Sequence, residues 1–367
     1  MKGIHRFGLR FALVVAFVAL AGGCSVWVLG VVQSFGSQSG PKISTIAGNG
    51  TAGYSGDNVL ATSTELNQPY GVAIDSSGNL FIADSKNNRV RMVAPSGNIT
   101  TIASGLNGPV GVAVDSSTGY IYFSDTSNFV VRKYDPSIPS VTIFAGNVGA
   151  PGIIGDGGPA LSANLDYPYG LAVGSGYLYI AQMGFSSVVR KVDLLTNTIS
   201  RVAGTGSPGF TGDGGAAISA NLNYPQGVAV DSSGNLYIAD SSNYVIRKVT
   251  PGGTISTIVG TGINGNSGDG GPAIAAQINW PNGVTVDAGG NLYISGGDNT
   301  VRKVDVSTKL ISTVAGNVHL AAGYGGDGNV ATAATLNAPW GLAFDLFGNL
   351  LIGDRVNNRI RKVALGQ

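Results

Sequence analysis

The sequence predicts an all-β fold, a six-bladed β-propeller with four antiparallel strands in each blade, and three observations support this prediction. A segment of the type NYPQGVAVDSSGNLYIADSSNYVIRKVT (residues 223–250) occurs six times. Successive copies are 40 to 59 residues apart, a spacing typical of propellers and solenoids. The first strand of each copy is built from smaller residues than the strands that follow it. The glycines shared by the copies are Gly71, Gly111, Gly170, Gly227, Gly283 and Gly341.

Each copy contains four short strands separated by polar turns. In the fourth copy, the Val/Ala run at 227–231 ends at Asp-Ser-Ser-Gly-Asn, a sequence typical of a tight hairpin. The second strand covers residues 236–240 and the third covers 245–249, with a polar turn between them. A fourth strand at 255–259 follows a Pro-Gly-Gly turn. This order predicts four antiparallel strands in each blade.

The gradient of side-chain size across each copy favours a ring over a linear array. Gly, Val and Ala of the first strand fit a crowded axis, whereas Tyr, Ile, Arg and Lys of the later strands fit the wider rim. The last copy ends at Val363 after only three strands, and a separate fourth-strand sequence, ISTIA (43–47), precedes the first copy. We therefore expect residues 43–47 to complete the last blade and close the ring, which removes two open sheet edges.

Five of the six copies are preceded by a related insertion built around Gly-Asp, usually followed by Gly-Gly-Pro-Ala and by spaced Ala and Leu residues. The pattern predicts a turn followed by one or two helical turns that pack Ala and Leu inward. A calcium loop is the alternative, but each loop offers one carboxylate, whereas calcium takes several oxygen ligands, so turn structure is favoured. The aspartates concerned are Asp57, Asp156, Asp213, Asp269 and Asp327.

The first 32 residues have the features of an export signal or membrane anchor. Lys2, Arg6 and Arg10 precede an uncharged apolar stretch at residues 11–32. This stretch is long for a signal peptide and is about the length of one membrane span. Because basic residues stay on the cytoplasmic side, the segment predicts that the rest of the chain lies outside the cytoplasm, attached to the membrane or cell surface.

The sequence LAGGC, which ends at Cys24, resembles a bacterial lipoprotein processing site, although the residues after Cys24 stay apolar. Three outcomes are left open: lipidation at Cys24, an uncleaved signal-anchor and an ordinary cleaved signal. In each case, residues 33–41 form a Ser/Gly linker and residues 42–367 form the propeller.

Charge and cysteine content narrow the expected partners. Charged residues make up 11% of the chain, against about 25% in a typical domain. Without Lys2, Arg6 and Arg10, 18 basic residues stand against 20 acidic ones. We expect no nucleic-acid partner, since binding a phosphate backbone depends on clustered Lys and Arg. Cys24 is the only cysteine, so the chain forms no intramolecular disulfide.

The repeated pattern from Pro-x-Gly-Val-Ala-Val-Asp to Ile-Arg-Lys-Val resembles the NHL repeat. The insertions resemble those of bacterial NHL arrays and of the related propeller of teneurins. This resemblance covers residues 42–363 and implies a six-bladed propeller. It implies less about function, because NHL-type propellers include protein- and RNA-binding platforms, sensor domains and a few enzymes, such as the peptidylglycine amidating lyase.

An enzyme is the less favoured interpretation. The chain has two histidines, His5 and His319, and one glutamate, Glu65, so a zinc centre or a general-base dyad has few residues to draw on. The metal histidines of the amidating lyase have no counterparts here. The alternative is a calcium-dependent, lactonase-like hydrolase or lyase, which the shortage of carboxylates disfavours. Its ligands would be Asn67, Asn107, Asp166, Asn223, Asn279 and Asn337.

Charged residues that recur on the second and third strands of the copies are interpreted as structural rather than catalytic. A catalytic site needs a few residues that differ from those at the same position in the other copies. We interpret the recurring residues as turn-bonding groups and ion pairs at the blade edges. The third copy breaks the pattern with Gln182 and the fifth with Gly296, through drift or because a ligand enters there. The repeated residues are Asp84, Asp125, Asp240 and Asp354, and Arg91, Arg132, Arg190, Arg247, Arg302 and Arg361.

The residues on either side of the proline that opens each copy vary from blade to blade and are rich in Tyr and Trp. Aromatic rings provide a large contact area with a hydrogen-bond donor, as binding surfaces do. Two interpretations are left open: a ligand-binding rim around one mouth of the channel, and packing between neighbouring blades. The predicted rim consists of Tyr70, Tyr167, Tyr169, Tyr224, Trp280 and Trp340.

These observations together predict an extracytoplasmic, membrane-tethered propeller that acts as a non-enzymatic binding scaffold. The expected ligand is a protein, a peptide or a glycan, and no cofactor or metal is expected.

Overall fold

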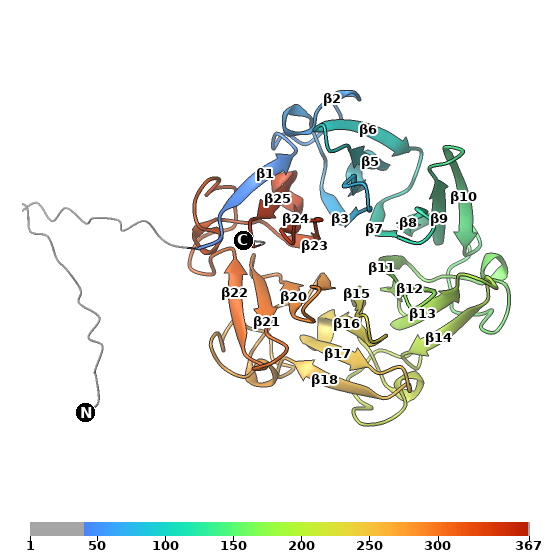
Figure 1. Cartoon of the computed structure of the whole chain (residues 1–367). Helices are drawn as coiled ribbons and strands as arrows, with labels where there is room; N and C mark the ends of the chain where they lie inside the picture. Colours follow the sequence, from blue (N-terminus) through green and yellow to red (C-terminus); the bar gives the residue numbers. More distant parts are fainter. Residues whose placement is uncertain (1–39, 366–367) are drawn as a thin grey trace, which may run out of the picture. The chain divides into compact units, whose positions relative to one another are not determined.

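The computed structural model describes residues 40–365, which form a six-bladed β-propeller (Figure 1). Each blade is a sheet of four antiparallel strands, and the first strand of each blade lies nearest the central axis. The fold class predicted from the sequence is confirmed.

The strands occupy equivalent places in the six blades. The first strands are β3 (Pro69–Ile74), β7 (Pro109–Val114), β11 (Pro168–Gly174), β15 (Pro225–Val230), β19 (Val284–Val286) and β23 (Pro339–Phe344). The second strands are β4 (Leu80–Asp84), β8 (Ile121–Asp125), β12 (Tyr177–Gln182), β16 (Leu236–Asp240), β20 (Leu292–Ser295) and β24 (Leu350–Asp354). The third strands are β5 (Arg89–Val93), β9 (Val130–Asp135), β13 (Val188–Asp193), β17 (Val245–Val249), β21 (Val301–Val304) and β25 (Arg359–Val363). The outer strands are β6 (Asn98–Ala103), β10 (Ser140–Ala145), β14 (Ile199–Ala203), β18 (Ile255–Val259), β22 (Ile311–Ala315) and β1 (Ile43–Ala47), and the two-residue β2 (Val59–Leu60) pairs with β6.

Single turns of 3-10 helix occur in two places. Those between second and third strands are η2 (Ser85–Asn87), η3 (Thr126–Asn128), η6 (Ser241–Asn243) and η9 (Arg355–Asn357). Those in the insertions are η1 (Ala61–Ser63), η4 (Ala160–Ser162), η5 (Ala217–Ser219), η7 (Ala273–Ala275) and η8 (Ala331–Ala333). The helical part of each insertion is therefore at the short end of the one or two turns predicted from the sequence.

The N-terminal strand closes the ring as predicted. β1 is the outer strand of the last blade, in the order β1-β25-β24-β23. Ile43 pairs with Val363, and Thr45 pairs with Arg361. This pairing joins the two ends of the described chain. It gives the last blade its fourth strand, so each of the six blades has an outer strand.

The hydrophobic core consists of six clusters, each lying between two neighbouring blades. Between the second and third blades, Val131 and Leu178 belong to one cluster, together with Leu165 from the insertion that links these blades. Between the first and second blades, where the insertion is missing, Leu106 of the shorter link takes part instead. The insertions therefore stabilise the ring by sealing the junctions between blades.

A buried arginine on the third strand forms an ion pair with an aspartate of each insertion. The guanidinium of Arg247, on β17, is fully buried and lies 2.7 Å from Asp213 of the insertion and 3.4 Å from Asp240 at the end of β16. The insertion therefore buries the arginine of each pair expected at the blade edges, whereas its own aspartate stays partly exposed (46% for Asp213). Removing that aspartate would leave the buried arginine with one carboxylate partner fewer. The equivalent pairs are Arg91–Asp57, Arg190–Asp156, Arg302–Asp269 and Arg361–Asp327.

The residue at the end of each second strand holds the bend that leads into the first strand. Asp240 accepts a hydrogen bond from the backbone N–H of Asn223 at 2.7 Å, and three other blades repeat this bond. In the third blade, Gln182 accepts the same bond from Asp166 at 2.8 Å. The change to glutamine therefore preserves the bend. Gly296 of the fifth blade has no side chain to do so, and the first strand of that blade is the shortest of the six.

Glycine in each first strand lets neighbouring blades meet at the axis. A Cβ atom added to any of the six repeat glycines would lie within 2.5 Å of a backbone oxygen of the next blade. At Gly227, that oxygen belongs to Asn282. Only glycine permits so close an approach of two backbones, which explains its recurrence at this position.

Among residues 40–365, no helix has the length and the apolar character needed to cross a membrane. The predicted export segment, Cys24 and most of the predicted linker lie outside the described residues.

Candidate binding face

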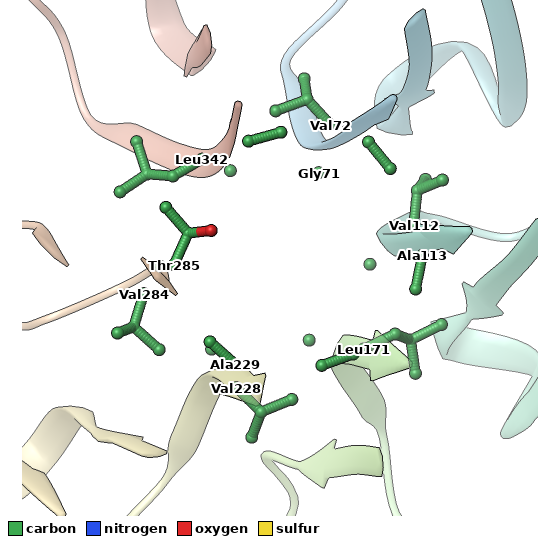
Figure 2. Close-up of a pocket in the computed structure, with 18 of the residues that line it drawn as sticks. Gly71, Val72, Val112, Ala113, Leu171, Val228, Ala229, Val284, Thr285 and Leu342 are labelled. Carbon is green, nitrogen blue, oxygen red and sulfur yellow. The ribbon is translucent and has the colours of Figure 1, made fainter. Parts of the chain in front are cut away.

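The six first strands surround an axial cavity of about 300 Å³ (Figure 2). Its lining consists mainly of Gly, Val and Ala residues of these strands, with Leu171, Leu342 and Trp340 among the larger side chains. Thr285 carries the one side-chain oxygen visible in Figure 2. Each first strand is an edge of its sheet, so unpaired backbone N–H and C=O groups face the axis. The lining residues include no charged side chain. The cavity therefore offers backbone hydrogen bonds to a guest but no acid, base or carboxylate ligand.

Four residues that directly follow an opening proline meet over the axis and cover one end of this cavity. Trp340, Tyr70 and Tyr169 contact one another edge to face, with ring centroids 5.7 to 6.2 Å apart. The Trp340 Nε1–H donates a hydrogen bond to Gln226 Oε1 at 3.0 Å. These contacts join the first, third, fourth and sixth blades. We call Tyr70, Tyr169, Gln226 and Trp340 the hub layer.

Burial in the hub layer differs from that of an open rim. Trp340 is only 6% exposed, and Tyr70 and Tyr169 are half-buried. Burial raises the pKa of the Tyr169 phenol above its usual range, and the neighbouring Tyr70 adds to this increase. Trp340, predicted as part of a rim, therefore does not project into solvent. Its contacts are those of a residue that packs between blades.

The residue that precedes each opening proline lies at a junction between two blades and has a positive φ of 38° to 63°. It faces a second residue of positive φ, which lies in the preceding blade just before the third strand. At three junctions the latter is asparagine, and its side-chain oxygen accepts a hydrogen bond from the next blade at 2.8 to 2.9 Å. We call these bonds the asparagine latches. In these latches Asn88 accepts from the backbone N–H of Gly108, Asn299 from that of Ala338 and Asn358 from that of Gln68. At a fourth junction, the Ser187 hydroxyl accepts the equivalent bond from Tyr224.

At the two remaining junctions, a pair of aromatic rings stands in place of the latch. Phe129 contacts Tyr167 edge to face with ring centroids 4.9 Å apart, and Tyr244 contacts Trp280 at 5.4 Å. Tyr167 is 39% exposed and Trp280 is 41% exposed. Bulky residues are strained at positive φ, whereas asparagine tolerates it well. Phe129 and Tyr244 therefore occupy the position where, at other junctions, asparagine is less strained and adds a hydrogen bond.

The two aromatic pairs lie on one face of the propeller. The start of the first strand, the end of the second and the start of the third adjoin one another, as Pro225 and Val245 show by pairing with Asp240. Phe185, which is 80% exposed, and the half-buried Tyr224 lie on this face between the two pairs. We call the whole set the aromatic arc: Phe129, Tyr167, Phe185, Tyr224, Tyr244 and Trp280.

Sequence reasoning identified half of the aromatic arc. It found Tyr167, Tyr224 and Trp280 because they precede prolines of the repeat. It missed Phe129, Phe185 and Tyr244, which lie in the turns between second and third strands. Only the structure shows that these turns adjoin the opening proline of the next blade.

Within residues 40–365, no three His, Cys, Asp or Glu side chains lie close enough together to hold a metal ion. The residues considered as calcium ligands make bends instead: the backbone N–H groups of Asn67 and Asn223 donate to the second-strand aspartates. The carboxylate of Asp166 accepts hydrogen bonds from the backbone and hydroxyl of Ser186. These three residues therefore lie at the bends that lead into first strands.

Buried carboxylates of the repeat have perturbed acidity. Burial raises the pKa of Asp84 to about 6 and that of Asp240 to about 6, although hydrogen bonds and a nearby arginine act in the opposite direction. Both side chains are fully buried and hold backbone bends. These shifts therefore belong to the framework of the propeller and bear on its stability.

Comparison with protein families identifies the repeats. The family model of the NHL repeat matches residues 66–91, and the family model of the teneurin NHL domain matches residues 205–265. The second match spans the whole sheet of β15 to β18. The chain is an NHL-repeat propeller. The resemblance noted in the sequence is thereby confirmed.

Teneurins are similar to the NHL propeller over most of its length. Teneurin-3 of Danio rerio is 30% identical over 376 residues, which cover 90% of this chain and 13% of that protein. Teneurin-1 of Homo sapiens is 27% identical over 381 residues, which cover 91% of this chain and 13% of that protein. The propeller therefore corresponds to a small part of each teneurin.

Solved structures share the fold at low sequence identity. An auxiliary nutrient binding protein from Bacteroides thetaiotaomicron has a TM-score of 0.68 at 15% identity, covering 92% of this chain and 79% of its own. A gluconolactonase from Xanthomonas campestris has a TM-score of 0.59 at 14% identity, covering 88% and 89%. At these identities the likeness shows the fold alone, because one propeller architecture supports both binding and enzymatic functions.

Proposed function

We propose that the NHL propeller is an extracytoplasmic, membrane-tethered scaffold that binds a protein, a peptide or a glycan through the aromatic arc. The observation that carries this proposal is the replacement of the asparagine latch by exposed aromatic pairs at two of the six junctions. A purely structural junction would be served better by asparagine, which forms the latch at three other junctions. Strained residues that persist in a fold tend to mark functional sites.

The chemistry of the arc suits recognition of an uncharged surface. It contains no charged residue, and its rings offer contact area at a small entropic cost, with hydrogen-bond donors on Tyr and Trp. The arc extends over neighbouring blades, so a ligand can contact several rings at once. Propellers of the same fold include a nutrient binding protein and a chain from a nidogen/laminin complex, which supports a binding role for this architecture.

The location follows from the N-terminal segment. A positively charged start and the apolar stretch that follows it would carry the propeller out of the cytoplasm, and lipidation at Cys24 or a retained signal-anchor would keep it at the membrane. An extracytoplasmic scaffold with an uncharged binding face would then meet ligands at the cell surface.

The test compares two surface variants of the full-length protein on peptide and glycan arrays. The double variant Tyr167→Ser/Trp280→Ser removes the exposed ring of each pair. The matched control is Phe347→Ser, which removes an exposed ring (79% exposed) from the hairpin between β23 and β24, outside the arc. We expect wild type and control to bind the same ligands and the double variant to lose them without a large change in melting temperature. Equal binding by all three proteins would refute the arc as the binding surface.

A further inference from the structure

Arg355 breaks the repeat at a position that joins neighbouring blades. In the second and fourth blades, the residue after the second strand carries a hydroxyl that donates to a backbone oxygen of the next blade. Thr126 donates to Pro168 at 2.8 Å, and Ser241 donates to Pro281 at 2.6 Å. In the sixth blade, arginine occupies this position. Met183 and Gly297 occupy it in the third and fifth blades, so Arg355 is the one charged residue among the six. Functional residues of a repeat protein are expected where a copy departs from the others.

The Arg355 side chain reaches the hub layer instead of making a local backbone bond. Its guanidinium carbon lies 4.9 Å from the centre of the Tyr70 ring, and Nη1 donates a hydrogen bond to the Tyr70 hydroxyl. Tyr70 in turn contacts the rings of Tyr169 and Trp340. A positive charge therefore lies against the Tyr70 ring, which in turn contacts the two other aromatic rings of the hub layer.

The guanidinium has unused hydrogen-bonding capacity. Within the described part of the chain, no Asp or Glu forms an ion pair with Arg355, whereas the buried third-strand arginines each pair with an aspartate. Its Nε is buried without a hydrogen-bond partner in the described residues, as are the Nε atoms of Arg91, Arg247, Arg359 and Arg361, so Arg355 differs from the buried Arg91, Arg247 and Arg361 in having no carboxylate partner there. An arginine side chain has five N–H donors, and the Tyr70 hydroxyl accepts from one of them. Among residues 40–365, the Arg355 guanidinium therefore carries a positive charge that no carboxylate neutralises by direct contact.

We propose that Arg355 and Tyr70 form an anion subsite that takes the carboxylate of a ligand, while an apolar part of that ligand lies against the hub layer. The planar guanidinium matches a carboxylate with two parallel hydrogen bonds, and such charge-assisted bonds are stronger than neutral ones. The aromatic rings of Tyr70, Tyr169 and Trp340 provide an apolar surface beside the charge. The subsite shares no residue with the aromatic arc.

The test uses benzoate as the probe and benzamide as its neutral counterpart, with binding to the full-length protein measured by ligand-observed NMR. We expect benzoate to bind at millimolar concentrations and benzamide to bind more weakly. Replacing Arg355 with glutamine should weaken benzoate binding by about tenfold to a hundredfold, the usual effect of losing a hydrogen bond to a charged group. The matched control is Arg201→Gln, which removes an arginine of β14 that bonds to the backbone of Thr205. It should leave benzoate binding unchanged.

Three results would overturn the proposal: no benzoate binding to wild type, equal binding to the Arg355→Gln variant, or displacement of benzoate by inorganic phosphate at lower concentration. If the glutamine variant fails to fold, Arg355→Lys serves as a second variant. It keeps the charge but loses the planar pair of N–H donors, so it should still weaken benzoate binding. The variant Tyr167→Ser/Trp280→Ser should bind benzoate normally. Failure of the hub subsite is therefore distinguishable from failure of the aromatic arc.

Discussion

Replacing Trp340 with alanine should show that the hub layer is part of the core. Trp340 is 6% exposed, contacts two tyrosines edge to face and donates a hydrogen bond to Gln226. Cutting a buried tryptophan to alanine typically lowers the free energy of unfolding by about 3–5 kcal/mol. The adjoining cavity lets water reach Gln226 and relieves part of the cost of its missing partner. We therefore expect a loss of about 4 kcal/mol.

Trp280 provides the matched control. It is 41% exposed and has one edge-to-face contact, with Tyr244. Its replacement by alanine should cost about 1 kcal/mol, the worth of one aromatic pair. In a domain of this size, 1 kcal/mol corresponds to about 2 °C in melting temperature. The expected decreases are therefore about 8 °C for Trp340→Ala and about 2 °C for Trp280→Ala.

The assay is thermal and urea-induced unfolding followed by circular dichroism. A Trp340→Phe variant keeps a ring but loses the N–H group, and it should fall between wild type and Trp340→Ala. Equal melting temperatures for Trp340→Ala and Trp280→Ala would refute the division of the opening-proline aromatics into a buried hub and an exposed arc.

Three further perturbations test the framework. Deleting Lys42–Ala47 removes β1 and opens an edge of the last blade, so light scattering should show aggregation; melting like that of the full propeller would contradict the ring closure. Burial raises the pKa of Asp240 to about 6 from its ordinary 3.8, so the folded state binds the proton more tightly than the unfolded state does. The stability that this proton contributes is lost as the pH rises through about 6, so Asp240 should add about 1 kcal/mol to the free energy of unfolding between about pH 7 and about pH 5. Asp84 titrates in the same range, so Asp240→Asn should gain about 1 kcal/mol less than wild type over this interval; identical pH profiles of unfolding would contradict the shift. If Cys24 is lipidated, Cys24→Ala should abolish labelling by a fatty-acid analogue, and a labelled variant would exclude that modification site.

Closure of the ring could be predicted from the sequence because every blade needs the same four strands. The last copy has no fourth strand, and ISTIA (43–47) has no first three, so the two could be matched without knowledge of the structure. The buried ion pairs were harder to place. That Arg247 pairs with two aspartates at once depends on how the insertion folds back over its blade, which the repeat pattern does not specify.

The candidate site could be predicted only in part. Tyr167 and Tyr169 flank the same proline and look equivalent in the sequence, but Tyr167 takes a positive φ and faces solvent, whereas Tyr169 faces the axis. The sequence shows that Arg355 stands where other copies have an uncharged residue, but not which side chains it contacts. Its lack of a carboxylate partner among the described residues is a property of the folded structure alone.

The most direct test of the central claim is the unfolding free energy of the double variant Phe129→Asn/Tyr244→Asn. Each change installs an asparagine latch in place of an aromatic pair. A latch gains a hydrogen bond worth about 0.5–1.5 kcal/mol and relieves strain at positive φ, and together these two effects offset the removal of one edge-to-face ring pair. If the aromatic arc is kept for binding, the variant should be as stable as wild type or more stable, and it should no longer bind the array ligands. A fall in stability of more than about 2 kcal/mol would show instead that the aromatic pairs hold the blades together.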